Sequence, residues 1–515
     1  MDAGGDAATE DWGPFGRPLF DDPSARALAR VGVVDVGSNS VRLVIFDGAA
    51  RSPAYFFNEK VMAGLGAGMA ETGRLNPEGK IRALSAIKRF QLLAEAMGIA
   101  PLTAVATAAV REAEDGPAFR ADVWRETGLR LWVIDGEEEA RLSAQGVLLG
   151  WPGAEGLISD IGGSSMELAT LADGRVGRRV SSKLGPQRLK TIKGGKKGVK
   201  AHIRAEIEAL LDIVGKEPKR LFLVGGSWRA IARIDMERRG YPLAVLHEYR
   251  MTRKDILATV NYIAERSPED LRLRTGIGES RMDLVPLAAL VLKELVKQVK
   301  PGEIAVSSYG IREGMLYEQM PQRLRDRDPL VEACRFIEQK DARIPGFGRR
   351  LYDFVMPLFK ARNAPAKRLI KAACLLHDVN WRAHPDYRHE VCFDTVTRAN
   401  LGGMTHGERV FLGVALMHRY KNSREGSPFA PLFDLIGEHE LRQAEILGKA
   451  LRFGAMLTAS EDGAMGELRY FPKKQCLELR LVPGTRALFG EVAEARLAAL
   501  AAALGADVSV VVKGR

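Results

Sequence analysis

Two short segments of the chain combine an aspartate with a run of small polar residues, a combination that can bind phosphate. Asp35 precedes Gly37-Ser38-Asn39-Ser40, and Asp160 precedes Gly162-Gly163-Ser164-Ser165. Apolar residues typical of β-strands flank both runs, so each segment is predicted to form a hairpin. Backbone N–H groups and hydroxyls in such turns can donate to anionic oxygens, and the aspartates can hold a metal ion or a water molecule.

A third run, Gly225-Gly226-Ser227, follows the apolar residues 221–224. Any one of these runs alone would more often be an ordinary turn. Because all three follow strand-like segments in successive α/β units, they predict a phosphate-binding cleft between two lobes.

Three adjacent glutamates, Glu137, Glu138 and Glu139, precede the sequence Ala140-Arg141-Leu142. They cannot all face one cleft from a strand end or a first helical turn. A carboxylate in the cleft could act as a general base on water. From the residues alone, a solvated acidic turn at a helix N-terminus, which the helix dipole favours, is an equally open interpretation.

The order of these motifs resembles the exopolyphosphatase/guanosine pentaphosphate phosphatase family, which belongs to the actin/sugar-kinase/Hsp70 superfold. The resemblance covers roughly residues 31–320 and continues more loosely beyond them. It rests on VDVGSNSVRL, on EARL with its preceding glutamates, on DIGGSSMEL, and on SYGIREG followed by Met-Leu-Tyr. It implies an α/β fold of duplicated actin-like (ribonuclease H-like) lobes around a central cleft.

The resemblance also implies roles for five residues. The acidic residue directly before Ala-Arg-Leu is the family's catalytic one, which makes Glu139 the expected base. Asp160 and Glu167 are expected to hold a divalent cation, Mg²⁺, with Asp35 in a similar part on the opposite wall. Arg111 matches the arginine that the family places against the attacked phosphate.

The residues expected to contact substrate come from the three glycine-serine runs and from the lysine-rich segment 190–200. This segment is predicted to be a flexible loop that acts as a lid or track for a phosphate chain, or is simply solvated. It has no interleaved aromatic residue, which argues against single-stranded nucleic acid as a partner. The expected contact residues are Ser38, Asn39, Ser40, Gly162, Gly163, Ser164, Ser165, Gly226, Ser227, Lys193, Lys196 and Lys197.

Two departures from the family pattern bear on this site. Ser164 stands where the family commonly has a third glycine, and a serine in a left-handed conformation would be strained. Trp228 and Arg229 stand where the family commonly has Gly-Thr. A bulky tryptophan there could block a nucleotide or stack on one.

Composition restricts the binding partners and the cellular compartment that we expect for this protein. The chain has 515 residues, a formal net charge of +11, and 46% hydrophobic residues. The positive balance favours a polyanion such as polyphosphate. Four scattered cysteines and no apolar run of about 18 residues favour a cytoplasmic protein without a membrane span. Residues 1–16 are acidic and glycine-rich, so we expect residues 1–30 to form a flexible tail rather than a signal peptide.

We expect five regions: the tail (1–30), lobe I (31–150), lobe II (151–320), a helical HD-like domain (330–460) and a small α/β cap (461–515). A linker is predicted at 321–329. His377-Asp378 is typical of HD phosphohydrolases, but no histidine lies between His247 and His377 to supply the earlier ligand. A degenerate HD-like domain that extends a phosphate channel or supports a homodimer is therefore expected.

The preferred function is a processive exopolyphosphatase that removes terminal phosphate from inorganic polyphosphate with Mg²⁺. A guanosine pentaphosphate 5′-phosphohydrolase is the alternative within the same fold. A non-catalytic nucleotide- or polyanion-binding member of the actin superfold is the alternative from another class.

Overall fold

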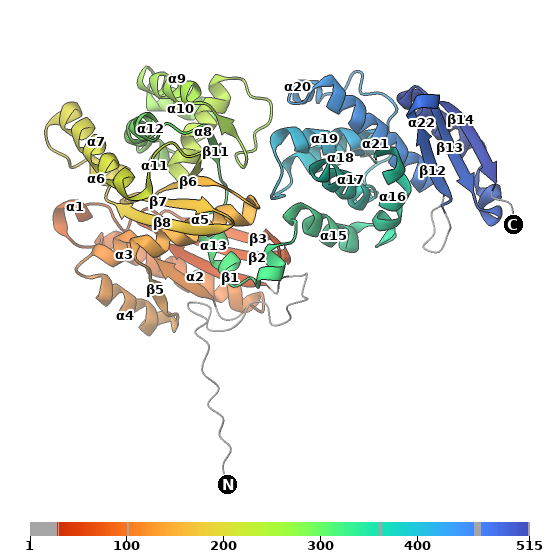
Figure 1. Cartoon of the computed structure of the whole chain (residues 1–515). Helices are drawn as coiled ribbons and strands as arrows, with labels where there is room; N and C mark the ends of the chain where they lie inside the picture. Colours follow the sequence, from red (N-terminus) through yellow and green to blue (C-terminus); the bar gives the residue numbers. More distant parts are fainter. Residues whose placement is uncertain (1–27, 29, 100–101, 360–362, 458–464, 513–515) are drawn as a thin grey trace, which may run out of the picture. The chain divides into compact units, whose positions relative to one another are not determined.

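The computed structural model describes residues 28, 30–99, 102–359, 363–457 and 465–512 (Figure 1). The chain divides into two compact units after Arg327, and each unit is described by itself. Within the predicted tail, Leu28 is buried and its backbone N–H donates to the Gly48 carbonyl oxygen at 2.8 Å. Apart from Leu28 and Arg30, the predicted tail lies outside the described residues.

Lobe I of the first unit is built on a five-stranded sheet with the order β3-β2-β1-β4-β5. Strands β1, β2 and β3 are antiparallel, whereas β4 and β5 run parallel to β1. The strands are β1 (Val31–Val36), β2 (Val41–Ala49), β3 (Ser52–Val61), β4 (Thr103–Ala106) and β5 (Leu131–Val133). Strands β1 and β4 are almost wholly buried, as expected of central strands covered on both faces.

Four helices belong to lobe I: α1 (Met69–Thr72), α2 (Pro77–Ala96), α3 (Ala108–Glu112) and α4 (Gly116–Thr127). The side chain of Asn76 caps the start of helix α2 by accepting a hydrogen bond from the Gly79 N–H at 2.8 Å, and Pro77 is the first helical residue. Helix α3 follows β4 directly and carries Arg111.

Lobe II repeats this arrangement in a six-stranded sheet with the order β10-β11-β9-β6-β7-β8. Strands β8, β7, β6, β9 and β11 correspond in order and direction to the five strands of lobe I, and β10 adds an antiparallel edge. The strands are β6 (Gly156–Ile161), β7 (Met166–Ala172), β8 (Arg175–Ser182), β9 (Arg220–Val224), β10 (Arg250–Met251) and β11 (Glu303–Val306). The predicted duplicated, two-lobed α/β fold is confirmed.

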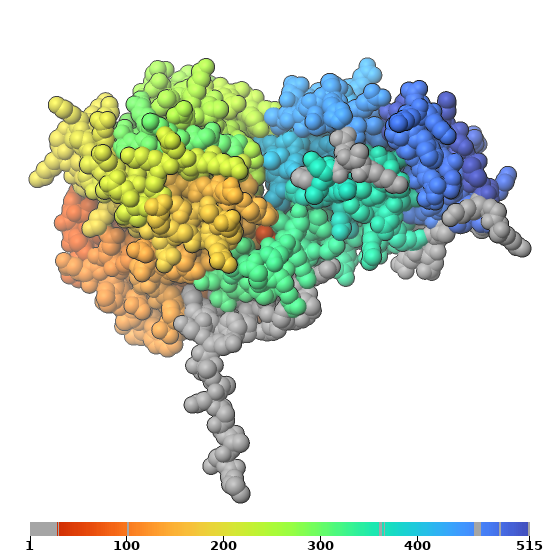
Figure 2. Space-filling model, in the orientation of Figure 1, coloured from red at the N-terminus to blue at the C-terminus, as the bar shows by residue number. Residues whose placement is uncertain are grey.

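The helices of lobe II are α6 (Pro186–Leu189), α7 (Gly195–Val214), α8 (Gly226–Arg238), α9 (Arg253–Ala264), α10 (Pro268–Thr275), α11 (Glu279–Met282) and α12 (Val285–Val299). The prediction of a flexible loop up to Lys200 is wrong for residues 195–200, because α7 begins at Gly195. Gly194 takes the left-handed conformation before the first turn, and Val199 is already buried, so the apolar stripe extends that far. Figure 2 shows the yellow segment with α6 and α7 at the surface.

The second unit is helical and then mixed. Its helices are α15 (Pro329–Asp341), α16 (Phe347–Val355), α17 (Ala364–Leu376), α18 (Arg388–Arg398), α19 (His406–His418), α20 (Ala430–Phe433) and α21 (Glu438–Leu457). A three-stranded sheet of β12 (Glu467–Phe471), β13 (Cys476–Leu481) and β14 (Asp507–Val512) follows, with α22 (Glu491–Leu504) beside it. This is the predicted small α/β cap. A short helix, α14 (Gln322–Arg325), lies within the predicted linker.

Two helices connect the lobes: α5 (Gly136–Gly150) and α13 (Ile311–Glu318). One buried apolar cluster contains side chains from both helices and from both sheets. The helices approach closely because glycines face the contact. A Cβ on Gly314 would lie 1.8 Å from the carbonyl oxygen of Leu142, and a Cβ on Gly146 would lie 2.2 Å from that of Gly310. Helix α5 is thereby held directly against α13.

We expect Gly314→Ala to lower the free energy of unfolding by about 1–3 kcal/mol, because the added methyl group forces the helices apart. Urea denaturation would show this as a lower midpoint. Gly278→Ala is the matched control, since a Cβ at Gly278 meets no atom within 4 Å. Equal midpoints for the two variants would contradict close helix packing.

Candidate active site

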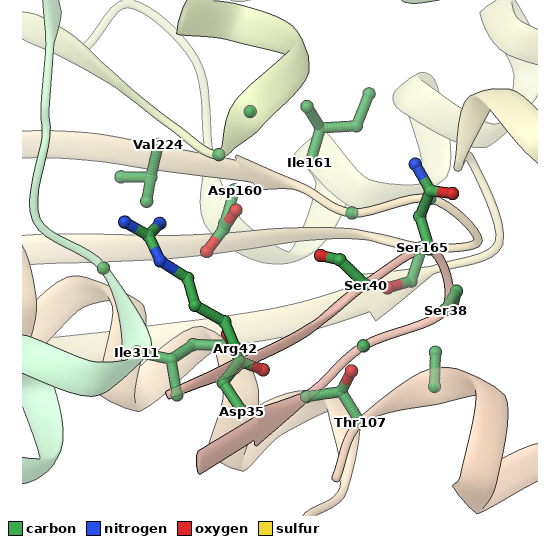
Figure 3. A pocket seen from close by; sticks show the side chains of 18 of the residues that line it. Asp35, Ser38, Ser40, Arg42, Thr107, Asp160, Ile161, Ser165, Val224 and Ile311 are labelled. Atoms are coloured by element: carbon green, nitrogen blue, oxygen red, sulfur yellow. The ribbon is translucent and has the colours of Figure 1, made fainter. Parts of the chain in front are cut away.

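A cavity of about 200 Å³ lies between the hairpin of lobe I and the hairpin of lobe II (Figure 3). In Figure 3, Ser40 and Ser165 reach it from the two hairpins, and Arg42 extends from lobe I toward the wall that carries Asp160. Of the predicted site residues, those that line it are Asp35, Ser38, Asn39, Ser40, Glu139, Asp160, Gly162, Gly163, Ser165 and Gly226.

The two hairpin turns have the same local structure. The Gly37 N–H donates to the Ser40 carbonyl oxygen at 3.0 Å, and the Gly162 N–H donates to that of Ser165 at 3.0 Å. Across the cleft, the Ser164 hydroxyl donates to Ser38 Oγ at 3.0 Å and so joins the two turns. Ser164 does not have a positive φ. The predicted strain at this serine is therefore wrong, because the turn closes without a left-handed residue at that position.

Glu139 is the one of the three adjacent glutamates that lines the cavity. The three lie in the first turn of α5, whose start is capped by the Asp135 side chain. Helical geometry points them in different directions: Glu137 faces Arg179, Glu138 binds Arg141, and Glu139 is 6% exposed.

Arg111 contacts Glu139 rather than the cavity itself. Its Nη1 donates to Glu139 Oε2 at 3.2 Å and to the Ile134 carbonyl oxygen at 2.9 Å. Burial raises the pKa of Glu139 to about 8, the charge of Arg111 opposes the rise, and Asp160 and Asp35 add to it. Glu139 therefore has the environment of a group that exchanges a proton near neutral pH.

Asp160 and Glu167 are directly paired across strands β6 and β7, as the hairpin requires. Asp160 lines the cavity and accepts a hydrogen bond from the Ser143 hydroxyl. Glu167 lies behind it, 1% exposed, with Oε1 bound by Ser181 at 2.9 Å and no partner for the buried Oε2 in the described structure. Burial, with the charges of Glu139 and Asp160, raises the pKa of Glu167 well above its usual range.

Five cationic side chains that were not predicted also line the cavity: Arg42, Lys60, Arg229, Arg281 and Arg312. Arg42 pairs in register with Asp35 on one side and with Lys60 on the other, so all three lie on one face of the sheet. A signal for Arg42 was present, because it follows Asp35 by seven residues as Glu167 follows Asp160. Arg312 lies within the motif SYGIREG, and only its positive charge could have indicated an anionic ligand.

The third glycine run contributes only part of what was predicted. Gly225 and Gly226 line the cavity, whereas Ser227 is buried and outside it. Trp228 is 0% exposed, and its Nε1 donates to Ser159 Oγ at 3.3 Å. The prediction that Trp228 blocks or stacks on a nucleotide is wrong, because α8 begins at Gly226 and turns this side chain into the core of lobe II.

The predicted lysines Lys193, Lys196 and Lys197 are exposed and do not line either neighbouring cavity. A second cavity of about 330 Å³ adjoins the hairpin of lobe II, and Ser164 and Lys190 line it. Ser164 therefore lines this second cavity and not the one that Glu139 lines.

In the second unit, the pair His377-Asp378 is occupied by other contacts. The Arg343 guanidinium donates to both carboxylate oxygens of Asp378, at 2.8 and 2.6 Å, and His377 Nδ1 is 2.8 Å from the Cys374 carbonyl oxygen. Burial and the charge of Arg419 lower the pKa of His377 to about 4. Among the described residues, no three His, Cys, Asp or Glu side chains are grouped so as to hold a metal ion.

In the part of the chain that the structure describes, no helix is both long and apolar enough to span a membrane.

Residues 44–323 match the Ppx/GppA phosphatase family, and residues 342–511 match the exopolyphosphatase C-terminal domain. Exopolyphosphatase 1 of Mycobacterium tuberculosis is 26% identical over 322 residues, which cover 59% of this chain and 92% of that protein. Retrograde regulation protein 2 of Saccharomyces cerevisiae is 25% identical over 434 residues, 76% of this chain and 72% of that protein.

Solved structures share this fold over more than half of the chain. An exopolyphosphatase from Cytophaga hutchinsonii superposes with a TM-score of 0.52 at 25% identity, covering 57% of this chain and 98% of that one. The Aquifex aeolicus Ppx/GppA protein gives a TM-score of 0.50 at 24% identity with the same coverage. Since the family match spans more than half of the 515 residues, the chain belongs to the Ppx/GppA phosphatase family.

Proposed function

We propose that the protein is an exopolyphosphatase that removes orthophosphate processively from the end of inorganic polyphosphate. One observation carries this proposal: a single cavity is lined by three carboxyl groups, two glycine-serine turns and five cationic side chains. A phosphoanhydride resists hydrolysis because its oxygens repel an incoming nucleophile, so catalysis needs charge neutralisation and a positioned water molecule. The cavity offers groups for both tasks.

Glu139 would take the proton from the attacking water, and Arg111 would hold its carboxylate in place through their 3.2 Å contact. The turns around Ser40 and Ser165 would donate N–H and O–H groups to the oxygens of the terminal phosphoryl group. Water adds to phosphorus, the bond to the bridging oxygen breaks, and that oxygen leaves with the shortened chain. Arg111 therefore acts as a positioning residue for the base.

Mg²⁺ fits the donor set on the lobe II side. Mg²⁺ commonly binds one or two carboxylates and completes its shell with water and substrate phosphate, so it does not need three protein ligands. Asp160 and Glu167 would hold it, and the unpartnered Oε2 of Glu167 is an acceptor that such a cation would satisfy. When bound, the ion would neutralise charge on the phosphate oxygens.

Guanosine pentaphosphate is the second candidate substrate for the same cavity. The burial of Trp228 supports keeping it, because the side chain that would have obstructed a nucleotide lies in the core. Competition between guanosine pentaphosphate and long-chain polyphosphate for phosphate release would separate the two candidates.

The wider setting is also proposed. A cytoplasmic location agrees with the cysteines, which are free thiols, three of them buried. The helical part of the second unit would be a degenerate HD-like domain, because the Asp378 carboxylate is paired with the Arg343 guanidinium. Assembly as a homodimer rests on the family resemblance alone.

Glu139→Ala should lower kcat for long-chain polyphosphate by about 10²–10⁴-fold, because the general base is lost. Binding of the chain should be retained, since the cationic side chains are unchanged. Glu137→Ala is the matched control, because the neighbouring Glu137 side chain is 66% exposed. Release of phosphate by Glu139→Ala at the wild-type rate would refute the assignment of the base.

The pH dependence should report the pKa of Glu139, which is about 8 in the free enzyme. Only the ionised carboxylate accepts a proton, so kcat/KM should rise with pH up to that value and level off above it. Arg111 lowers this pKa, whereas burial, Asp160 and Asp35 raise it. Arg111→Gln should therefore move the rising limb to higher pH.

The matched control for the pH profile is Arg120→Gln, which removes an exposed guanidinium on α4. Its limb should coincide with that of the wild type when both are measured at a fixed Mg²⁺ concentration. If the rising limb of kcat/KM lies at the same pH in Arg111→Gln as in the wild type, a group other than Glu139 governs the profile.

A further inference from the structure

Arg111, which contacts the proposed base, lies between two carboxylates. Its Nη1 donates to Glu139 Oε2 at 3.2 Å, and its Nη2 lies 3.7 Å from Glu112 Oε1. Arg111 and Glu112 are neighbours in the last turn of α3, so the Glu112 carboxylate stays within reach of the same guanidinium. If that carboxylate had no other partner, it would compete with Glu139 for Arg111.

The second oxygen of Glu112 has a partner from the opposite lobe. Arg188 of α6 donates through Nη2 to Glu112 Oε2, and both side chains are 23% exposed. Four charges thus alternate in sign, in the order Glu139, Arg111, Glu112 and Arg188. The first three belong to α5 and α3, whereas Arg188 belongs to lobe II. The ion pair with Arg188 therefore offsets the charge that would otherwise attract Arg111.

The backbone around Arg188 is held against the hairpin turn of lobe II. The Gln187 N–H donates to the Gly163 carbonyl oxygen at 2.9 Å, and Gly163 lines the cavity. A Cβ on Gly185 would lie 2.1 Å from the carbonyl carbon of Ser164, so α6 begins in backbone contact with this turn. Arg188 therefore follows the position of a turn that faces the substrate cavity.

Arg188 itself lines the second cavity and not the one that Glu139 lines. We propose that Arg188 is a positioning residue for the base. By pairing with Glu112 across the lobes, it leaves Arg111 bound to Glu139. This inference rests on the proposed function, in which Glu139 accepts the proton of the attacking water. It makes the placement of the base depend on lobe II, although the base lies on α5.

The first test measures phosphate release from long-chain polyphosphate at a fixed Mg²⁺ concentration. Arg188→Gln should lower kcat by about 10- to 100-fold, the cost of a misplaced catalytic group, because Glu112 then draws Arg111 toward itself. KM should stay within about threefold, since Arg188 does not line the cavity of the base. Arg253→Gln is the matched control. It removes an exposed guanidinium on α9 of the same lobe and should change neither constant.

A second substitution separates this role from a structural one. Glu112→Gln in the Arg188→Gln background removes the competing carboxylate, so kcat should return to within about threefold of the wild type. If Arg188 only fastened the lobes together, the second substitution would restore nothing, because the ion pair is already broken. A double variant no faster than Arg188→Gln would therefore overturn the proposal.

Crystal structures of the two variants give a readout that does not depend on turnover. In Arg188→Gln, the Arg111 guanidinium should contact Glu112 and no longer Glu139. In the double variant it should contact Glu139 again. If Arg111 stays within hydrogen-bond distance of Glu139 in Arg188→Gln, the proposal is wrong even where kcat falls.

Failure of the proposed function has a different signature. In that case the wild-type protein releases no phosphate from polyphosphate, whereas the position of Arg111 in the two crystal structures still decides whether Arg188 acts on it.

Discussion

Like charges held together in one partly dehydrated cavity are the constraint on which the rest of the site depends. Asp35, Glu139 and Asp160 line the same hollow, and burial raises the pKa of each of them. Such a group of carboxyl groups is tolerable only beside compensating positive charge. Arg111 supplies it behind Glu139, and Arg312 supplies it beside Asp35 and Asp160. Four further cationic side chains, those of Arg42, Lys60, Arg229 and Arg281, line the same cavity.

Local patterns in the sequence predicted the parts of this arrangement that depend on nearby residues. The two hairpins follow from strand-forming residues around a small polar turn, and the pairing of Asp160 with Glu167 follows from their register. Glu139 was singled out through the family resemblance, and helical geometry gives the physical reason, because only one of three adjacent residues can face inward. The family resemblance implied the duplication of the lobes, and their repeated strand order agrees with it.

The parts that depend on long-range packing could not be predicted. Arg281 reaches the cavity from α11, and no local motif announces it. The orientation of the Trp228 side chain depends on the residue at which α8 begins. A single glycine sets the start of this helix. In the second unit, Arg343 lies 35 residues before Asp378 and occupies its carboxylate, a pairing that neither sequence segment indicates alone. The lysines of 193–197 show the opposite case. Their sequence motif is conspicuous, but their side chains do not line the cavity.

The close contact between α5 and α13 has a mechanical meaning. Glu139 lies in the first turn of α5 and Arg312 in the first turn of α13, and glycines at the crossing bring these helices into backbone contact. Helices that touch in this way should move as one rigid body, so the spacing of base and guanidinium should not change when the cleft opens. A polyphosphate chain that advances by one unit would then present each new terminal phosphoryl group to Glu139 at the same place.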